Sequence, residues 1–167
     1  MKQRLPGWAL LGLLVALAVA GPLVALPEIA ENSQLLHFIE GVQVKDQGML
    51  DENNWFTVEN LYFESESSDL KVGSEKELNS IAKLMKAYPT TKIKIGGYTD
   101  NTGNESNNIQ LSKLRAQTAK LKLLEMGIAA DRIETEGYGP QYPVCEANDT
   151  DDCKAQNRRI DIRLLNY

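Results

Sequence analysis

The sequence predicts an α+β fold of two layers, in which helices cover one face of a small mixed sheet. Stretches with apolar residues at helical spacing alternate with short stretches rich in branched and aromatic residues. Their order is strand, helix, strand, helix, strand, loop, strand. Connections long enough to carry a helix place that helix on a face of the sheet. We therefore expect a βαβαββ-type domain over residues 55–167, preceded by an N-terminal hydrophobic helix.

The first half of the domain should contain one strand and one helix. The strand is predicted in "WFTVENLYFE" at 55–64, which is rich in aromatic and branched residues. The polar stretch that follows is expected to be a loop. A helix should begin after Ser74, because Glu77 would complete a capping box three residues later. Its apolar residues recur at helical spacing until Pro89, which ends the helix.

The second half should contain three more strands and a longer helix. The strands are predicted in "KIKIGGYT" at 92–99, "RIETEGYG" at 132–139 and "RRIDIRLL" at 158–165, where apolar and polar residues alternate or branched residues gather. The helix is predicted over 106–126, with Gly127 ending it. The polar stretch between the last two strands is expected to be a loop.

The N-terminal residues 1–26 are expected to direct the chain across a membrane. Two positive charges precede an uncharged run over residues 8–26. Cleavage of a signal peptide after Ala20 fits the small-residue rule. An uncleaved transmembrane anchor fits the length of the run, because a bilayer-spanning helix needs ~20 residues. On either interpretation the rest of the chain is exported, and residues 27–54 form a linker to the folded domain.

The two cysteines are expected to form a disulfide. Cys145 and Cys153 lie eight residues apart in one polar stretch, and cysteines of an exported chain usually pair. Two free thiols are the alternative, whereas a metal site would need more ligands than two thiols. We expect the disulfide to stiffen a loop that lies outside the binding site.

Composition and motifs argue against several classes of function. The net charge is −5 and there is no basic stripe, so nucleic acid is not an expected partner. Glycan hydrolysis would need paired carboxylates, a metal or an activated nucleophile. The single histidine, His37, lies in the linker, and no motif of this kind is apparent. We therefore assign no catalytic residue, no metal ligand and no cofactor, and expect that the protein is not an enzyme.

The second helix carries the residues that indicate a binding site. On a helical wheel, Asn108, Ser112 and Arg115 share one stripe with the small and apolar residues that follow. Polar groups facing a core need partners, and the turn before the helix supplies Asp100. Asp100 and Arg115 could form an internal salt bridge. Alternatively, they line a polar pocket for a ligand with an ammonium and a carboxylate, which arginine can bind bidentately.

Several motifs resemble those of one protein family. They are "YTDNTG" at 98–103, "NIQLSKLRA" at 108–116, "GYG" at 137–139 and "NRRIDI" at 157–162. Together they resemble the OmpA-like C-terminal domain family, the peptidoglycan-binding module of Gram-negative envelope proteins. The resemblance extends over roughly residues 55–167.

The resemblance implies a function and a set of ligand-binding residues. In the family, the residues matching Asp100 and Arg115 bind the meso-diaminopimelate of the peptide stem, and those matching Thr99, Asn108 and Leu111 lie beside them. The implied function is non-catalytic binding of peptidoglycan by a periplasmic domain of the cell envelope, so that the membrane is tethered to the wall through residues 8–26 if these stay uncleaved. The alternative is a scaffold subunit of an envelope complex, whose protein partners the sequence does not name.

One residue departs from the family pattern near the expected site. The family usually has a histidine where this chain has Tyr98. Because a tyrosine retains a hydrogen-bonding group at its tip, we expect the replacement to tune binding rather than abolish it.

Overall fold

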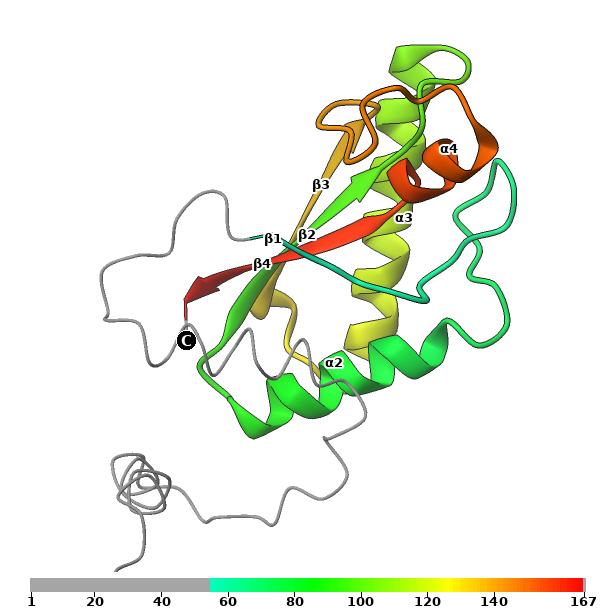
Figure 1. The fold of residues 1–167 in the computed structure, drawn as a ribbon. Helices are drawn as coiled ribbons and strands as arrows, with labels where there is room; N and C mark the ends of the chain where they lie inside the picture. Colours follow the sequence, from blue (N-terminus) through cyan, green and yellow to red (C-terminus); the bar gives the residue numbers. More distant parts are fainter. Residues whose placement is uncertain (1–54, 167) are drawn as a thin grey trace, which may run out of the picture.

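The computed structural model describes residues 55–166, and the expected α+β architecture is confirmed there. A four-stranded mixed sheet carries its two long helices on one face (Figure 1). The proposed N-terminal helix, the linker at 27–54 and His37 lie outside the described residues. Within 55–166, no helix is long and apolar enough to span a bilayer.

The sheet has the strand order β1-β4-β2-β3. Strands β2 and β3 are parallel, whereas β4 runs antiparallel to both of its neighbours. The parallel pair requires a long crossover, and α3 supplies it. The elements in chain order are β1 (Trp55–Thr57), α2 (Glu75–Ala87), β2 (Lys92–Tyr98), α3 (Glu105–Glu125), the 3-10 turn η2 (Ala130–Arg132), β3 (Ile133–Gly139), α4 (Asp151–Asn157) and β4 (Ile160–Asn166).

The first strand is shorter than the sequence predicts. It covers Trp55–Thr57 rather than 55–64, because the chain turns at Asn60, which has a φ of 58°. Beyond this turn the residues no longer continue the ladder: Leu61 is buried, Tyr62 is exposed and Phe63 is partly buried. Phe63 then makes an isolated bridge to Leu70. The segment 58–74 is therefore a loop that connects β1 to α2.

Ser74 has a different role from the one predicted. It is the N-cap residue of α2, but its side chain makes no capping hydrogen bond, so the capping box with Glu77 is wrong. Instead, the Ser74 hydroxyl accepts from the Tyr62 amide at 2.9 Å and donates to the Tyr62 carbonyl at 3.0 Å. The buried serine thus fixes the loop 58–74 to the start of α2.

The stretch between β3 and β4 contains a helix where the sequence predicts only a loop. Helix α4 begins after Thr150, whose hydroxyl accepts from the Cys153 amide at 3.2 Å. It has only seven residues, most of them polar, so it shows too little apolar periodicity to be recognised. The expected disulfide between Cys145 and Cys153 is present and joins this helix to the loop before it.

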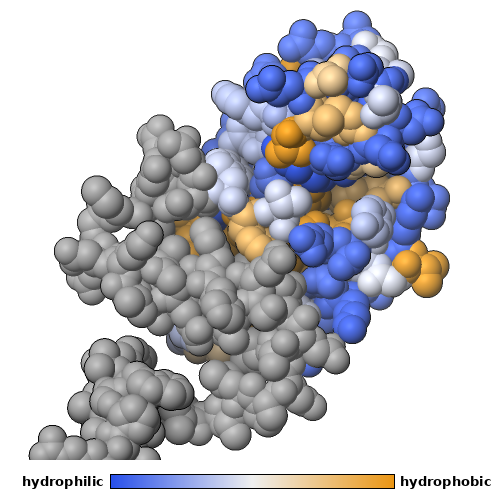
Figure 2. Space-filling model, in the orientation of Figure 1, coloured by the Kyte–Doolittle hydropathy of each residue, from blue (hydrophilic) through white to orange (hydrophobic). Residues whose placement is uncertain are grey.

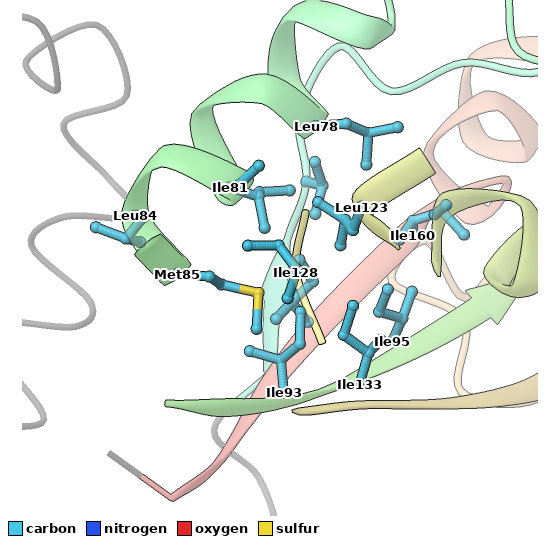
Figure 3. Close-up of a cluster of buried hydrophobic side chains, with 14 of the residues drawn as sticks. Leu78, Ile81, Leu84, Met85, Ile93, Ile95, Leu123, Ile128, Ile133 and Ile160 are labelled. Atoms are coloured by element: carbon cyan, nitrogen blue, oxygen red, sulfur yellow. The ribbon is translucent and has the colours of Figure 1, made fainter. Parts of the chain in front are cut away.

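The hydrophobic core lies between the two long helices and the sheet. Side chains of α2 point towards the strands, and branched residues of β2, β3 and β4 meet them (Figure 3). The cluster of buried residues contains no member from 134–159, so the segment carrying α4 is attached to the domain by other means. Labelled members of the core are Leu78, Ile81, Leu84, Met85, Ile93, Ile95, Leu123, Ile128, Ile133 and Ile160.

Arg132 links the end of α2 to the start of β3. Its guanidinium donates to the carbonyls of Met85 at 2.7 Å, Tyr88 at 2.8 Å and Thr91 at 2.8 Å. The last carbonyls of a helix have no partner within the helix, and a cation there also interacts favourably with the helix dipole. One side chain therefore closes the end of α2 and sets its position against the sheet.

Helix α3 rests directly on the backbone of β2 and β3. A Cβ atom at Gly97 would lie 2.1 Å from the Ser112 carbonyl oxygen, and one at Gly137 would lie 2.4 Å from the Lys113 nitrogen. Both positions thus need glycine because the backbone of α3 lies too close for a side chain, and not because of an unusual backbone conformation. The buried Ser112 hydroxyl accepts from the Gly139 amide at 2.9 Å, which explains a serine on the buried stripe of α3.

We expect Gly97→Ala to destabilise the domain by about 1–3 kcal/mol or more, because the methyl group would press on helix backbone that cannot move alone. Gly96→Ala is the matched control. The three atoms nearest to a Cβ at Gly96 belong to the rings of Trp55, Tyr138 and Tyr98, at 3.0–3.2 Å, and side chains can shift. Urea unfolding of the two variants should give a clearly larger loss for Gly97→Ala. Equal losses would contradict the proposed rigid contact.

Candidate functional site

The residues selected from the sequence meet in a cleft of about 1000 Å³ beside the N-terminal half of α3. The turn between β2 and α3 forms one wall and the loop 58–74 forms another. Helix α4 adds a third wall, and it lies near that loop at one end of the domain (Figure 1). All five predicted ligand-binding residues line this cleft: Thr99, Asp100, Asn108, Leu111 and Arg115.

Asp100 is a buried carboxylate that stays ionised. Its Oδ2 accepts from Nη1 of Arg158 at 2.6 Å, and its Oδ1 accepts from the Thr102 amide at 2.9 Å. Burial acts to raise the pKa of the Asp100 carboxyl, but the bonds from Arg158 and Thr102 outweigh it and hold the pKa below its ordinary value. The site therefore contains a fixed negative charge at neutral pH.

Arg115 is a buried cation whose partners are neutral. It is 6% exposed. Its Nε donates to the Ser67 carbonyl at 2.9 Å, its Nη2 lies 3.5 Å from the Glu64 carbonyl, and its guanidinium lies 5.3 Å from the centre of the Phe63 ring. Among residues 55–166, no carboxylate forms an ion pair with it. A desolvated cation without a counterion favours binding of an anion.

The electrostatic environment of Arg115 also favours binding of an anion beside it. Burial lowers the pKa of the Arg115 guanidinium, and the positive charge of Arg158 lowers it further, while Asp100 acts in the opposite direction. These shifts mean that the protonated form is less favoured here than in water. A carboxylate arriving beside Arg115 would relieve that unfavourable energy.

The internal Asp100–Arg115 salt bridge considered from the sequence is not formed. Asp100 pairs with Arg158 instead, at the end of α4. Arg158 is not among the predicted site residues, although it lies within the motif "NRRIDI". Its role depends on α4, a helix in a stretch predicted to be a loop, so the sequence does not place Arg158 opposite Asp100. The disulfide-bonded segment is therefore not outside the site, as we expected, but forms one of its walls.

The remaining predicted residues shape the cleft. Asn108 donates from Nδ2 to the Thr102 carbonyl at 2.9 Å and lies 3.5 Å from the Asp100 carbonyl, which holds the turn against α3. Thr99 is 5% exposed, and its buried hydroxyl has no partner among the described residues. Leu111 is half-buried and gives the wall an apolar portion.

Tyr98 does not belong to the cleft. Its ring stacks on Tyr138 with ring centres 5.1 Å apart, and the Arg159 guanidinium lies 3.8 Å from its centre. Successive residues of a strand point to opposite faces of the sheet, and the neighbouring Gly97 faces α3. The Tyr98 side chain therefore lies on the other face of the sheet, and its expected effect on binding stays a prediction.

The charges that line the cleft are balanced in sign, which suits a ligand carrying both an ammonium and a carboxylate. The visible face of the domain is mostly hydrophilic, with hydrophobic side chains scattered among polar ones (Figure 2). In the described part of the chain, no group of three or more histidine, cysteine or acidic side chains could hold a metal ion. The charged residues that line the cleft are four acidic ones, Glu64, Glu66, Asp100 and Asp151, and four basic ones, Lys71, Arg115, Lys154 and Arg158.

Comparison with curated proteins gives relatives that are named as a probable lipoprotein and as a peptidoglycan-binding protein. The chain is 41% identical over 105 residues to the probable lipoprotein YiaD of Escherichia coli (strain K12), covering 63% of this chain and 48% of that protein. It is 39% identical over 100 residues to the peptidoglycan-binding protein ArfA of Mycobacterium bovis, covering 60% of this chain and 30% of that protein. The chain thus spans about half or less of the length of these relatives.

Solved structures share the fold. The peptidoglycan-associated lipoprotein from Burkholderia pseudomallei matches with a TM-score of 0.59 and 28% identity, over 62% of this chain and 87% of that one. The C-terminal domain of Helicobacter pylori MotB matches in fold, with a TM-score of 0.60 and 20% identity, over 67% of this chain and 85% of that one. The OmpA family's sequence model matches residues 62–158, the segment that contains every residue lining the cleft. The chain belongs to the OmpA family.

Proposed function

We propose that the protein binds peptidoglycan without catalysis, by holding the meso-diaminopimelate of the peptide stem in this cleft. The observation that carries the proposal is Arg115, a buried guanidinium with no carboxylate partner in residues 55–166, in the same cleft as the ionised Asp100. A diaminopimelate side chain ends in an ammonium and a carboxylate on one carbon. The cleft offers one fixed charge for each.

The hydrogen-bonding capacity of the two residues leaves room for such a ligand. A guanidinium has five N–H donors, and the Ser67 and Glu64 carbonyls take two of the donors of Arg115. A carboxylate has about four acceptor sites, and Arg158 and Thr102 use two of those of Asp100. The ligand carboxylate would bind Arg115 and its ammonium would bind Asp100, while the buried Thr99 hydroxyl could accept or donate a further bond.

The names of the relatives support the cell envelope as the place where the proposed peptidoglycan binding occurs. ArfA is named as a peptidoglycan-binding protein, the Burkholderia protein as a peptidoglycan-associated lipoprotein, and further relatives, 35% identical over 102 residues and 34% over 103, are outer membrane porins. We propose that the domain lies in the periplasm and holds the wall. If the run at 8–26 remains uncleaved, it would tether the membrane to the wall.

The first test concerns the ligand. Full-length protein should sediment with sacculi whose stem peptides contain meso-diaminopimelate, and free meso-diaminopimelate should compete for it. Sacculi with lysine at that position should bind much more weakly, because lysine lacks the carboxylate that Arg115 is proposed to hold. Equal sedimentation with both kinds of sacculi would refute this assignment of the ligand.

The second test concerns the two charged residues. Asp100→Asn and Arg115→Lys should each weaken sacculus binding about tenfold or more, because a lost charge-assisted contact costs about 1.5–3 kcal/mol. Lysine keeps the charge of Arg115 but does not present its fork of donors. Lys113→Ala is the control, since Lys113 is an exposed cation on α3 that does not line the cleft.

Both site residues also have structural partners, so thermal midpoints must be measured alongside binding. The comparison should be made well below the midpoint of each variant. A folded Asp100→Asn or Arg115→Lys protein that binds sacculi as strongly as Lys113→Ala would show that the cleft is not the binding site.

A further inference from the structure

The segment between β3 and β4 reaches the cleft without support from the hydrophobic core. No residue of 134–159 belongs to the core cluster or to the partly buried residues packed against it. Yet α4 and the residue after it supply one wall of the cleft, through Asp151, Lys154, Ala155 and Arg158. Other interactions must therefore hold this wall in place.

Asn157, the last residue of α4, makes three of these interactions. It is 0% exposed. Its Oδ1 accepts from the amides of Val144 at 2.9 Å and Cys145 at 3.0 Å, and its Nδ2 donates to the Cys145 carbonyl at 2.9 Å. Since an amide oxygen has two lone pairs, its acceptor capacity is fully used. The end of α4 is thus fixed to two consecutive residues of the preceding loop.

The disulfide fixes the start of the same helix to the same residue. Cys153 lies in the first turn of α4 and is bonded to Cys145. Cys145 therefore holds α4 at both ends, through its sulfur at the first turn and through its backbone at Asn157. A short helix attached at two points cannot rotate about its axis independently of the loop.

The orientation of α4 determines where Arg158 lies. Arg158 follows the helix directly, and its Nη1 donates to Oδ2 of Asp100 at 2.6 Å. The Arg158 side chain is 44% exposed, so it is not confined by surrounding packing. Its position against Asp100 must come from the backbone that carries it. We propose that Asn157 and the Cys145–Cys153 disulfide position Arg158 against Asp100, and thereby set the affinity of the cleft.

The effect on affinity rests on the proposed function of the cleft. The effect on the direction and the pKa of the Asp100 carboxylate does not, because it can be measured without a ligand. Arg158 helps to hold the Asp100 carboxylate ionised and pointing in a fixed direction. If the positioning is lost, Asp100 loses its strongest partner. Its carboxylate is then no longer held in a fixed direction for a ligand ammonium, and its pKa moves upwards.

The experiment compares wild type with the double variant Cys145→Ala/Cys153→Ala and with Asn157→Ala, all as full-length protein. Carboxyl NMR during a pH titration, without ligand, measures the pKa of Asp100. We expect a higher pKa in both altered proteins, and sacculus binding weakened by up to about tenfold, the factor that corresponds to about 1.4 kcal/mol. Because the core does not include this segment, thermal midpoints should fall only modestly.

Arg158→Ala separates positioning from a general loss of structure. It should weaken binding by at least as much as loss of the disulfide. Adding Cys145→Ala/Cys153→Ala to Arg158→Ala should then weaken binding no further, because both changes act through the same contact. Additive losses, or an unchanged pKa of Asp100 in a folded disulfide-free variant, would overturn the inference.

Reduction of the folded wild type gives the same test without a mutation. Dithiothreitol transfers two electrons and two protons to the S–S bond, giving two thiols, and is itself oxidised to its cyclic disulfide. The pKa of Asp100 should rise on reduction, and an unchanged pKa would again overturn the inference. If oxidised wild type does not bind sacculi at all, the proposed function fails, whereas the Asp100 titration still decides whether the disulfide positions Arg158.

Discussion

The direct contact between helix α3 and the backbone of β2 and β3 is the constraint on which the rest of the structure depends. Gly97 and Gly137 allow the helix to lie against the strands with no side chain between them. This contact fixes the start of α3 relative to the end of β2, where the chain forms the turn containing Asp100. The carboxylate of the turn and the guanidinium of Arg115 on the helix therefore reach one cleft, and their relative positions follow from packing of backbone on backbone.

Asp100 and Arg115 lie in one cleft but are not paired with each other. Asp100 is neutralised by Arg158, while Arg115 is held by carbonyl oxygens of the loop 58–74. Removing a cation from water without an anion is unfavourable, and the fold supports this arrangement through the surrounding packing and the carbonyl contacts. Such an arrangement leaves the counterion position open to a ligand. An internal salt bridge between Asp100 and Arg115 would satisfy both charges within the protein. It would leave no position beside Arg115 for an anion from outside.

Much of the fold and site could be predicted because the relevant signals are local and periodic. The apolar stripes of α2 and α3 and the alternation in the strands gave the two-layer architecture, and the helical wheel placed Arg115 on the stripe facing the sheet and the cleft. What failed depended on contacts distant in sequence. Helix α4 is too short and polar to show a period, so Arg158 had no predicted position. Ser74 serves the loop rather than the helix.

The position of β1 has a mechanical consequence. The described chain enters the sheet through a strand of three residues at its edge, whose only strand partner is β4. If the protein holds the wall at the cleft, as proposed, and the chain before residue 55 is anchored, tension would reach the domain first through this short ladder. A ladder of three residue pairs separates more readily than the core behind it. Every residue that lines the cleft lies in 62–158, so separation of β1 from β4 would leave all of the proposed binding residues in the part of the domain that follows β1.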